Sequence, residues 1–207
     1  TPKQLLVCAA MGATPPRYGH MPLILDEQGR KMSKRFGDVA VGQYRERGFL
    51  PEALVNYLAR LGWAHGDAEL FDVPALVQMF SVEGIGASAG KWDVAKLRWV
   101  NAHWMKSLPL ERVAADARPF LEARGYVLGE RWVAAVGALR ERSQTLVELA
   151  DSARVFFEAD DAVSVDREAV AAVLEPAAAL VEQAADAFAA VPEWSEVELE
   201  AAGKAVC

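Results

Sequence analysis

Cysteine is scarce in this 207-residue chain, and its scarcity argues against two kinds of architecture. The two cysteines, Cys8 and Cys207, lie near opposite ends and belong to no CxxC pair or Cys/His cluster. A disulfide-stabilised fold needs several cysteines, and a structural zinc site needs closely spaced ligands. The sequence therefore predicts neither a disulfide framework nor a zinc site, and we interpret Cys8 as a small buried residue of a helix.

Long apolar runs are also missing. No stretch approaches the roughly 20 apolar residues of a membrane span, and residues 1–12 do not have the charged and apolar regions of a signal peptide. Proline and glycine, at 10 and 15 residues, are too few for a disordered chain, and 53% of the residues are hydrophobic. We therefore expect a cytoplasmic globular protein with one or two cores and no membrane contact.

Positive charge is in deficit overall, with a net charge of −7, but it is unevenly distributed. Residues 30–47 carry six Lys or Arg against two acids, whereas residues 108–207 carry nine against nineteen. A phosphate-rich partner is therefore expected at the first segment, and the C-terminal half would need local basic spots to touch nucleic acid.

Helical periodicity dominates the chain and predicts a mainly α fold. Residues 130–158 carry an apolar stripe interrupted only at Ser143, which predicts one long bundle helix. Pro176 should divide the helix that Asp166 opens. The other predicted helices are 2–11, 39–47, 51–62, 73–80, 94–106 and 110–124, and a last one begins at the segment PEWSE.

A single strand is predicted at residues 20–25, followed by a turn at Asp26–Gly29. The segments 63–71 and 82–92 are predicted as loops. One strand cannot satisfy its own backbone groups, so it must pair with strands from elsewhere or belong to something larger.

Residues 30–37, RKMSKRFG, form the most distinctive candidate binding segment of the sequence. Lys31, Lys34 and Arg35 surround Ser33 in a short loop, and two lysines three residues apart can hold two phosphates together. A solvated basic turn is the alternative for an arbitrary lysine pair. A match to the whole motif K-M-S-K-[RS] arises by chance in only about one chain of this length in ten thousand. The motif therefore favours a polyphosphate site over a solvated basic turn.

The segment HMPLILDEQGRKMSKRFGD, followed by VGQYRERGFLPEALVNYLARLGW, resembles the region around the KMSKS signature of bacterial glutamyl-tRNA synthetases. The resemblance continues through KWDVAKLRWVNAHWMK and LRERSQTLVELADSARVFF to VPEWSEVELEAA, and so covers essentially the whole chain. Arg35 stands at the last signature position in place of Ser, and Met32 stands where Leu or Ile also occurs.

The resemblance implies a class I enzyme that activates glutamate with ATP and transfers it to tRNA(Glu). Lys34 would contact ATP and stabilise the pyrophosphate leaving group, with Lys31 as a supporting catalytic charge, and Met32, Ser33 and Arg35 would complete the loop. Mg²⁺ would accompany ATP, and the protein would be a monomer.

The resemblance also implies three parts. Residues 1–30 would be the end of a Rossmann-type catalytic domain, with one helix and one strand. Residues 31–106 would form the KMSKS loop and the stem-contact helices, and residues 107–207 would begin an α-helical bundle that binds the anticodon.

Three side chains are candidates for contact with tRNA phosphates. Arg45 and Arg47 lie on the helix after the loop, and Lys96 lies on the helix that begins at Asp93. For each of them the alternative is a solvated surface charge.

Parts of the resembling family have no counterpart here, so we expect the chain to be a fragment without aminoacylation activity of its own. Two alternatives stay open at this point. One is a non-catalytic helical fragment that binds tRNA or protein. The other is a sister class I enzyme such as glutaminyl-tRNA synthetase, although its β-barrel anticodon region does not match the long predicted helix.

Overall fold

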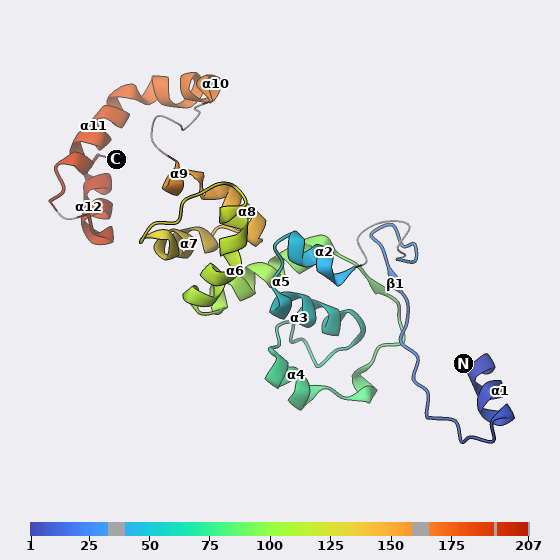
Figure 1. The fold of residues 1–207 in the computed structure, drawn as a ribbon. Helices are drawn as coiled ribbons and strands as arrows, with labels where there is room; N and C mark the ends of the chain where they lie inside the picture. The colour runs from blue at the N-terminus through green and yellow to red at the C-terminus, as the bar shows by residue number, and fades with distance from the viewer. Residues whose placement is uncertain (33–39, 159–165, 193, 207) are drawn as a thin grey trace. The chain divides into compact units, whose positions relative to one another are not determined.

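The computed structural model describes residues 1–32, 40–158, 166–192 and 194–206, and Figure 1 shows the course of the chain. The chain forms two compact units, Thr1–Glu158 and Ala159–Cys207. The loop residues Ser33, Lys34 and Arg35 lie outside the described residues.

The first unit begins with α1 (Pro2–Ala10), which has Thr1 at its N-cap position and Pro2 in its first turn. The strand β1 (Ile24–Leu25) is shorter than the predicted 20–25. It pairs in parallel with β2 (Gly90–Lys91), with Ile24 opposite Gly90 and Leu25 opposite Lys91. The prediction of a loop through residues 82–92 was therefore wrong at β2, which supplies the partner that the isolated strand required.

Four helices and one 3₁₀ turn form the middle of this unit: α2 (Val41–Glu46), α3 (Pro51–Gly62), α4 (Val73–Met79), η1 (Val82–Gly84) and α5 (Val94–Ser107). Helix α3 packs against both α5 and α4. The core between these helices includes Leu50, Tyr57, Trp92, Leu97 and Val100, all buried. The predicted helices 51–62 and 94–106 are confirmed, including Asp93 as the cap of α5, because its carboxylate accepts a hydrogen bond from the backbone N–H of Lys96.

The rest of the first unit consists of α6 (Leu110–Glu122), α7 (Trp132–Arg140), α8 (Leu146–Ser152) and α9 (Arg154–Phe157). Helix α6 packs on α7 and α8. The prediction of one long helix over 130–158 was wrong, because the chain leaves helical geometry after Arg140 and re-enters it at Leu146. The hydroxyl of Thr145 accepts a hydrogen bond from the N–H of Glu148 at 3.1 Å and so caps α8.

The second unit is a helical hairpin. Its first arm runs through α10 (Arg167–Ala169), the π-helical turn η2 (Val170–Leu174), the 3₁₀ turn η3 (Glu175–Ala177) and α11 (Ala178–Ala189), and its second arm is α12 (Glu196–Val206). Pro176 lies in η3, where regular α-helix is interrupted, so the predicted division of this helix is confirmed. Helices α11 and α12 pack against each other.

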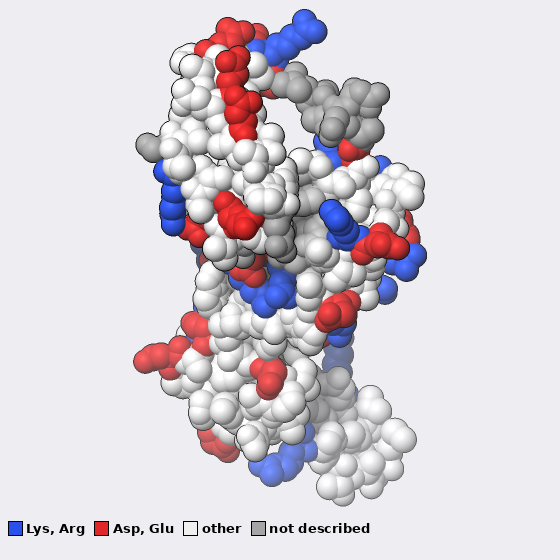
Figure 2. All heavy atoms as spheres, turned by 90° about the vertical axis from the view of Figure 1, so that its left-hand side faces the viewer, with Lys and Arg blue, Asp and Glu red and all other residues white. Residues whose placement is uncertain are grey.

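Charges of both signs are scattered over the molecular face shown in Figure 2, with wide white areas between them. Among the residues that the structure describes, no helix is both long and apolar enough to span a bilayer.

Candidate functional site

The base of the basic loop is a tight hairpin on β1. Lys31 forms an antiparallel bridge with Leu25, and the backbone N–H of Met32 donates to the carbonyl of Ile24 at 3.0 Å. Because β1 also pairs with β2 on its other side, Lys31 is held at one margin of a small three-segment sheet. The first signature lysine therefore has a backbone position set by hydrogen bonds.

Asp26 fixes the turn that leads into this hairpin. Its carboxylate accepts hydrogen bonds from the backbone N–H of Gln28 at 3.0 Å and of Arg30 at 2.8 Å. It also accepts a bond from Nε of Arg30 at 2.8 Å. An Asp that bonds the backbone two and four residues on stabilises a turn locally, so the chain enters the basic loop in one defined direction.

An apolar cleft of about 340 Å³ opens beside Lys31 and Met32. Lys31 is the charged side chain of its lining, and Met32 is half-buried against the main core. A cleft with apolar walls and a cation at one side can accept a ligand that has an apolar part and an anionic part. The other lining residues are Pro22, Leu23, Ile24, Val41, Tyr44, Leu54, Leu58 and Trp92.

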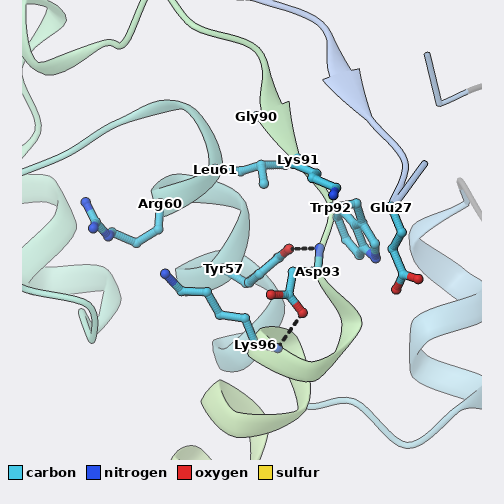
Figure 3. A pocket seen from close by; sticks show the side chains of 9 residues that line it. All are labelled: Glu27, Tyr57, Arg60, Leu61, Gly90, Lys91, Trp92, Asp93 and Lys96. Atoms are coloured by element: carbon cyan, nitrogen blue, oxygen red, sulfur yellow. Dashed lines mark hydrogen bonds between the residues drawn. The ribbon is translucent and has the colours of Figure 1, made fainter. Parts of the chain in front are cut away.

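A second cavity has a volume of about 460 Å³. The ring of Trp92 packs against Tyr44 and Tyr57, with centroids 5.2 and 4.9 Å away. Trp92 lines both cavities. This cavity is shown in Figure 3, and its other lining residues are Glu27, Tyr57, Arg60, Leu61, Gly90, Lys91, Asp93 and Lys96.

The wall of the second cavity is held by two hydrogen bonds drawn in Figure 3. The hydroxyl oxygen of Tyr57 accepts a bond from the backbone N–H of Asp93 at 2.7 Å, and the Asp93 carboxylate accepts one from the N–H of Lys96 at 3.0 Å. Burial raises the pKa of Tyr57 above its ordinary value. The first bond fixes the start of α5 against α3, and the second caps α5, so the position of Lys96 is determined by its helix.

Glu69 joins two of the cationic side chains of this cavity. Its carboxylate accepts bonds from Nε and Nη2 of Arg60 at 3.1 and 3.0 Å, and it pairs with Nζ of Lys96 at 2.9 Å. The hydrogen bonds from Arg60, followed by that from Lys96, lower the pKa of Glu69 to about 2. Figure 3 shows the Arg60 and Lys96 side chains extending to the same side, as this shared partner requires.

A buried amide holds the loop that carries Glu69. The side chain of Asn56, which is fully buried, donates from Nδ2 to the carbonyl of Glu69 at 2.9 Å. Its Oδ1 accepts from the N–H of Phe71 at 3.1 Å and from Nε1 of Trp104 at 3.2 Å. Since all its polar atoms are bonded, Asn56 secures the loop to α3 at little cost in desolvation.

The other two predicted phosphate contacts lie on α2. Arg45 is exposed in the last turn of α2. Arg47 lies at the C-cap of that helix, with its guanidinium carbon 5.6 Å from the centroid of the Tyr44 ring. A cation near a helix C-terminus is favoured by the helix dipole, which gives both arginines a structural role in addition to any binding role.

The structure thus groups the predicted residues in three places. Lys31 and Met32 share the apolar cleft, Lys96 lines the second cavity, and Arg45 and Arg47 lie on α2. Sequence reasoning missed four residues of the second cavity wall and its support, namely Arg60, Lys91, Glu69 and Asn56. Asn56 had a signal, because an amide inside an otherwise apolar helix stripe usually has buried partners. No local feature of the sequence predicted that Glu69 pairs with side chains of α3 and α5.

No group of three or more His, Cys, Asp or Glu side chains suited to a metal ion occurs in the described part of the chain.

Two family models match this chain. The model of class I tRNA synthetases (E and Q), catalytic domain, matches residues 1–99, and that of an anticodon binding domain matches residues 112–207. Glutamate–tRNA ligase of Cupriavidus necator is 43% identical over 211 residues, which span 100% of this chain and 44% of the relative. The ligase of Burkholderia ambifaria is also 43% identical, over 99% of this chain and 44% of the relative. The chain therefore spans less than half the length of these curated relatives.

Solved structures agree on the fold. The crystal structure of a glutamate tRNA ligase from Elizabethkingia meningosepticum in complex with its amino acid superposes with a TM-score of 0.76, at 23% identity. The match covers 99% of this chain and 45% of that one. Glutamate–tRNA synthetase from Elizabethkingia anophelis gives a TM-score of 0.75, also at 23% identity, over 99% of this chain and 44% of that one.

Proposed function

Because this chain belongs to the glutamate–tRNA ligase family of class I aminoacyl-tRNA synthetases, we propose that it supplies the ATP loop and the tRNA-side helices of an enzyme that charges tRNA(Glu). The reaction joins glutamate and ATP to an aminoacyl adenylate with release of pyrophosphate, and then passes the glutamyl group to tRNA. The observation that carries the proposal is the backbone bridge between Lys31 and Leu25, which anchors the first residue of the KMSKR motif to the β1 hairpin.

The proposed chemistry of the loop is charge stabilisation. Lys34 contacts the ATP phosphates and stabilises the negative charge that develops on pyrophosphate as it leaves, and Lys31 adds a second cation from the hairpin base. Nucleotidyl transfer depends mostly on positioning and on such electrostatic stabilisation. Mg²⁺ would accompany ATP and would help to neutralise the charge of its phosphates.

The proposed division of labour follows the chain. Residues 1–30 close the catalytic domain, residues 31–106 carry the loop and contact the tRNA stem, and residues 107–207 belong to the anticodon side. From α6 to α12 the described residues form helices and no strand, which favours glutamyl over glutaminyl specificity, since glutaminyl enzymes use β-barrels there. We propose a cytoplasmic monomer, in which Arg45, Arg47 and Lys96 contact tRNA phosphates.

A chimera tests this function. Residues 1–207 replace the segment of a curated glutamate–tRNA ligase to which they align, and glutamate-dependent ATP–pyrophosphate exchange and tRNA(Glu) charging are measured. Activity within about tenfold of the parent is expected. A chimera that unfolds cooperatively like the parent yet supports neither reaction, or that charges with glutamine instead, would contradict the proposal.

The 207-residue chain alone is the matched control. We expect it to show no glutamate-dependent exchange, because the residues that would bind glutamate are not among those identified in this chain. Exchange by the isolated chain above a no-enzyme blank would refute this expectation while leaving the family assignment intact.

A further inference from the structure

The stretch between Arg60 and Lys91 differs in charge from the basic loop and from the second cavity. It contains no Lys or Arg and has four acids, Asp67, Glu69, Asp72 and Glu83. Glu69 is bonded to Arg60 and Lys96, so its charge is compensated. The remaining acids stand on a surface that repels phosphate, which argues against RNA as its partner.

Helix α4, inside this stretch, turns large apolar side chains outward. Val73 and Val77 lie four residues apart on one face of α4, and Phe80 follows as the C-cap residue of this helix. Their exposed fractions are 52%, 78% and 53%. Val82, two residues after Phe80 in η1, is 71% exposed. We call these four residues the α4 ledge.

The ledge has defined backbone geometry. Helix α4 packs on α3, and the carboxylate of Asp72 caps it by accepting a bond from the N–H of Ala75 at 2.7 Å. The hydroxyl of Ser81 caps η1 at 3.3 Å from the N–H of Gly84. The ring of Phe80 lies 5.8 Å from that of the buried Trp63. A well-anchored apolar face costs little conformational entropy when it binds.

Acids stand at both ends of the ledge. Asp72 directly precedes Val73, and Glu83 directly follows Val82. An apolar patch rimmed by charge of one sign is the usual surface for a protein partner with the opposite rim.

We propose that the α4 ledge docks an amphipathic helical segment of another protein, one that presents apolar side chains on one face and Lys or Arg beside them. Apolar side chains of that helix would cover Val77 and Phe80, and its cations would face Asp72 and Glu83. This function is independent of ATP and tRNA binding, which use the basic loop, α2 and the second cavity. It therefore adds a protein-binding surface to the proposed ligase function without depending on it.

The test uses the 207-residue chain and two designed peptides of eighteen residues. Both carry Leu at i, i+4 and i+7 spacing, and their remaining positions are mainly Lys in one and mainly Glu in the other. Binding is measured by fluorescence anisotropy at physiological salt. We expect saturable binding of the Lys peptide and at least tenfold weaker binding of the Glu peptide.

Variants locate the binding. Val77→Ser and Phe80→Ser should each weaken binding of the Lys peptide about tenfold, the effect of losing one buried large apolar contact. The matched control is Val155→Ser, because Val155 is similarly exposed, at 72%, on α9. Its binding should be unchanged, and circular dichroism should show the same helix content for all variants.

Several outcomes overturn the proposal. Equal binding by all variants would mean that the Lys peptide binds nonspecifically to the acidic protein. The absence of saturable binding would mean that the ledge does not bind basic amphipathic helices. Self-association that Val77→Ser abolishes in light scattering would assign the ledge to a second copy. Loss of tRNA binding in the same variant would assign it to RNA.

Discussion

The side chain of Asn101 accepts a hydrogen bond at 2.7 Å from the backbone N–H of Leu50, the residue that precedes α3. Its Nδ2 donates to the carbonyl of Gln144 at 2.6 Å. A single fully buried amide on α5 therefore links the start of α3, on the side of the basic loop, with the chain segment between α7 and α8. Leu146 strengthens the same junction by donating to the carbonyl of Gly48 at 3.0 Å.

Replacing Asn101 should destabilise the first unit strongly. Asn101→Leu leaves the buried N–H of Leu50 and the part-buried carbonyl of Gln144 without this partner. A buried group left unpaired costs about 1–3 kcal/mol, and a part-buried one costs less. We expect a loss of about 3 kcal/mol in the free energy of unfolding, measured by urea titration followed by circular dichroism. Lys106→Ala, at the exposed end of the same helix, should stay within about 0.5 kcal/mol of the parent. Equal effects of the two changes would show that Asn101 does not hold this junction.

Gly48 is required at this junction for two reasons that can be separated. Its φ of +79° disfavours any side chain, and a Cβ there would lie 2.6 Å from the backbone nitrogen of Val147. Gly125 has a similar φ of +81° but nothing within 4 Å of a Cβ. Gly125→Ala should cost about 1 kcal/mol from backbone strain alone, whereas Gly48→Ala should cost about 3 kcal/mol or more. Matching losses in urea unfolding would contradict the close approach.

The same segment explains where sequence reasoning failed. The apolar stripe over 130–158 predicted one helix, because apolar positions of three short helices happened to keep helical spacing. A local signal for the break was nevertheless present in Thr145 and Glu148, which form the T-x-x-E pattern of a helix start. Glu148 accepts from the N–H of Gln144 at 2.9 Å, which completes this cap one residue earlier than the usual pairing.

Other parts of the fold had no local signal. The helices that begin at Pro51 and after Asp93 could be predicted, since Pro and Asp favour first turns and caps regardless of their surroundings. By contrast, β2 exists because Gly90 lies beside Ile24, far away in the sequence. The cavity of Arg60 and Lys96 likewise depends on contacts between distant segments, so only the fold could bring its residues together.

Acid should weaken the contacts of Glu69 in a defined pH window. The pKa of this carboxyl falls from 4.5 to about 2 on folding, so the folded protein binds fewer protons there than the unfolded chain. The resulting stability is present above about pH 5 and is lost as the pH falls toward 2. Because the group is partly exposed, the contribution at neutral pH should be only about 1 kcal/mol.

Thermal unfolding from pH 7 to pH 2.5 measures this contribution. Glu69→Gln should be less stable than the parent at pH 7, and the difference should shrink as the pH falls through the window. Glu141→Gln is the control, because Glu141 is an exposed acid whose ion pairs are long, at 3.9 Å to Lys106 and 3.7 Å to Arg140. A parent-to-variant difference that stays constant with pH would contradict the ion pairs of Glu69 with Arg60 and Lys96.

The two signature lysines should differ in their effect on catalysis. In the active chimera, Lys34→Ala should lower the rate of ATP–pyrophosphate exchange about 10²-fold or more, as expected for a group that stabilises charge on the leaving phosphates. Lys31→Ala should cost only about tenfold, because its backbone anchoring survives and its role is supporting. A loss for Lys31→Ala that equals or exceeds that for Lys34→Ala would reverse these assignments.

Phosphate contacts should be visible in the salt dependence of tRNA binding. Each contact that is lost lowers the slope of log K against log salt by about one. Arg45→Ala and Arg47→Ala should each do so, whereas Arg118→Ala, a surface arginine paired with Glu122 on α6, should leave the slope unchanged.

Lys96 should behave differently because Glu69 already compensates part of its charge. Lys96→Gln should therefore lower the slope by less than one, and Glu69→Gln should raise both the slope and the affinity by releasing Lys96 and Arg60 toward phosphate. These changes are measured by filter binding at four or more salt concentrations. If Glu69→Gln left affinity unchanged while Lys96→Gln reduced it, Lys96 would bind phosphate without giving up its partner, and the competition inferred from the 2.9 Å ion pair would be wrong.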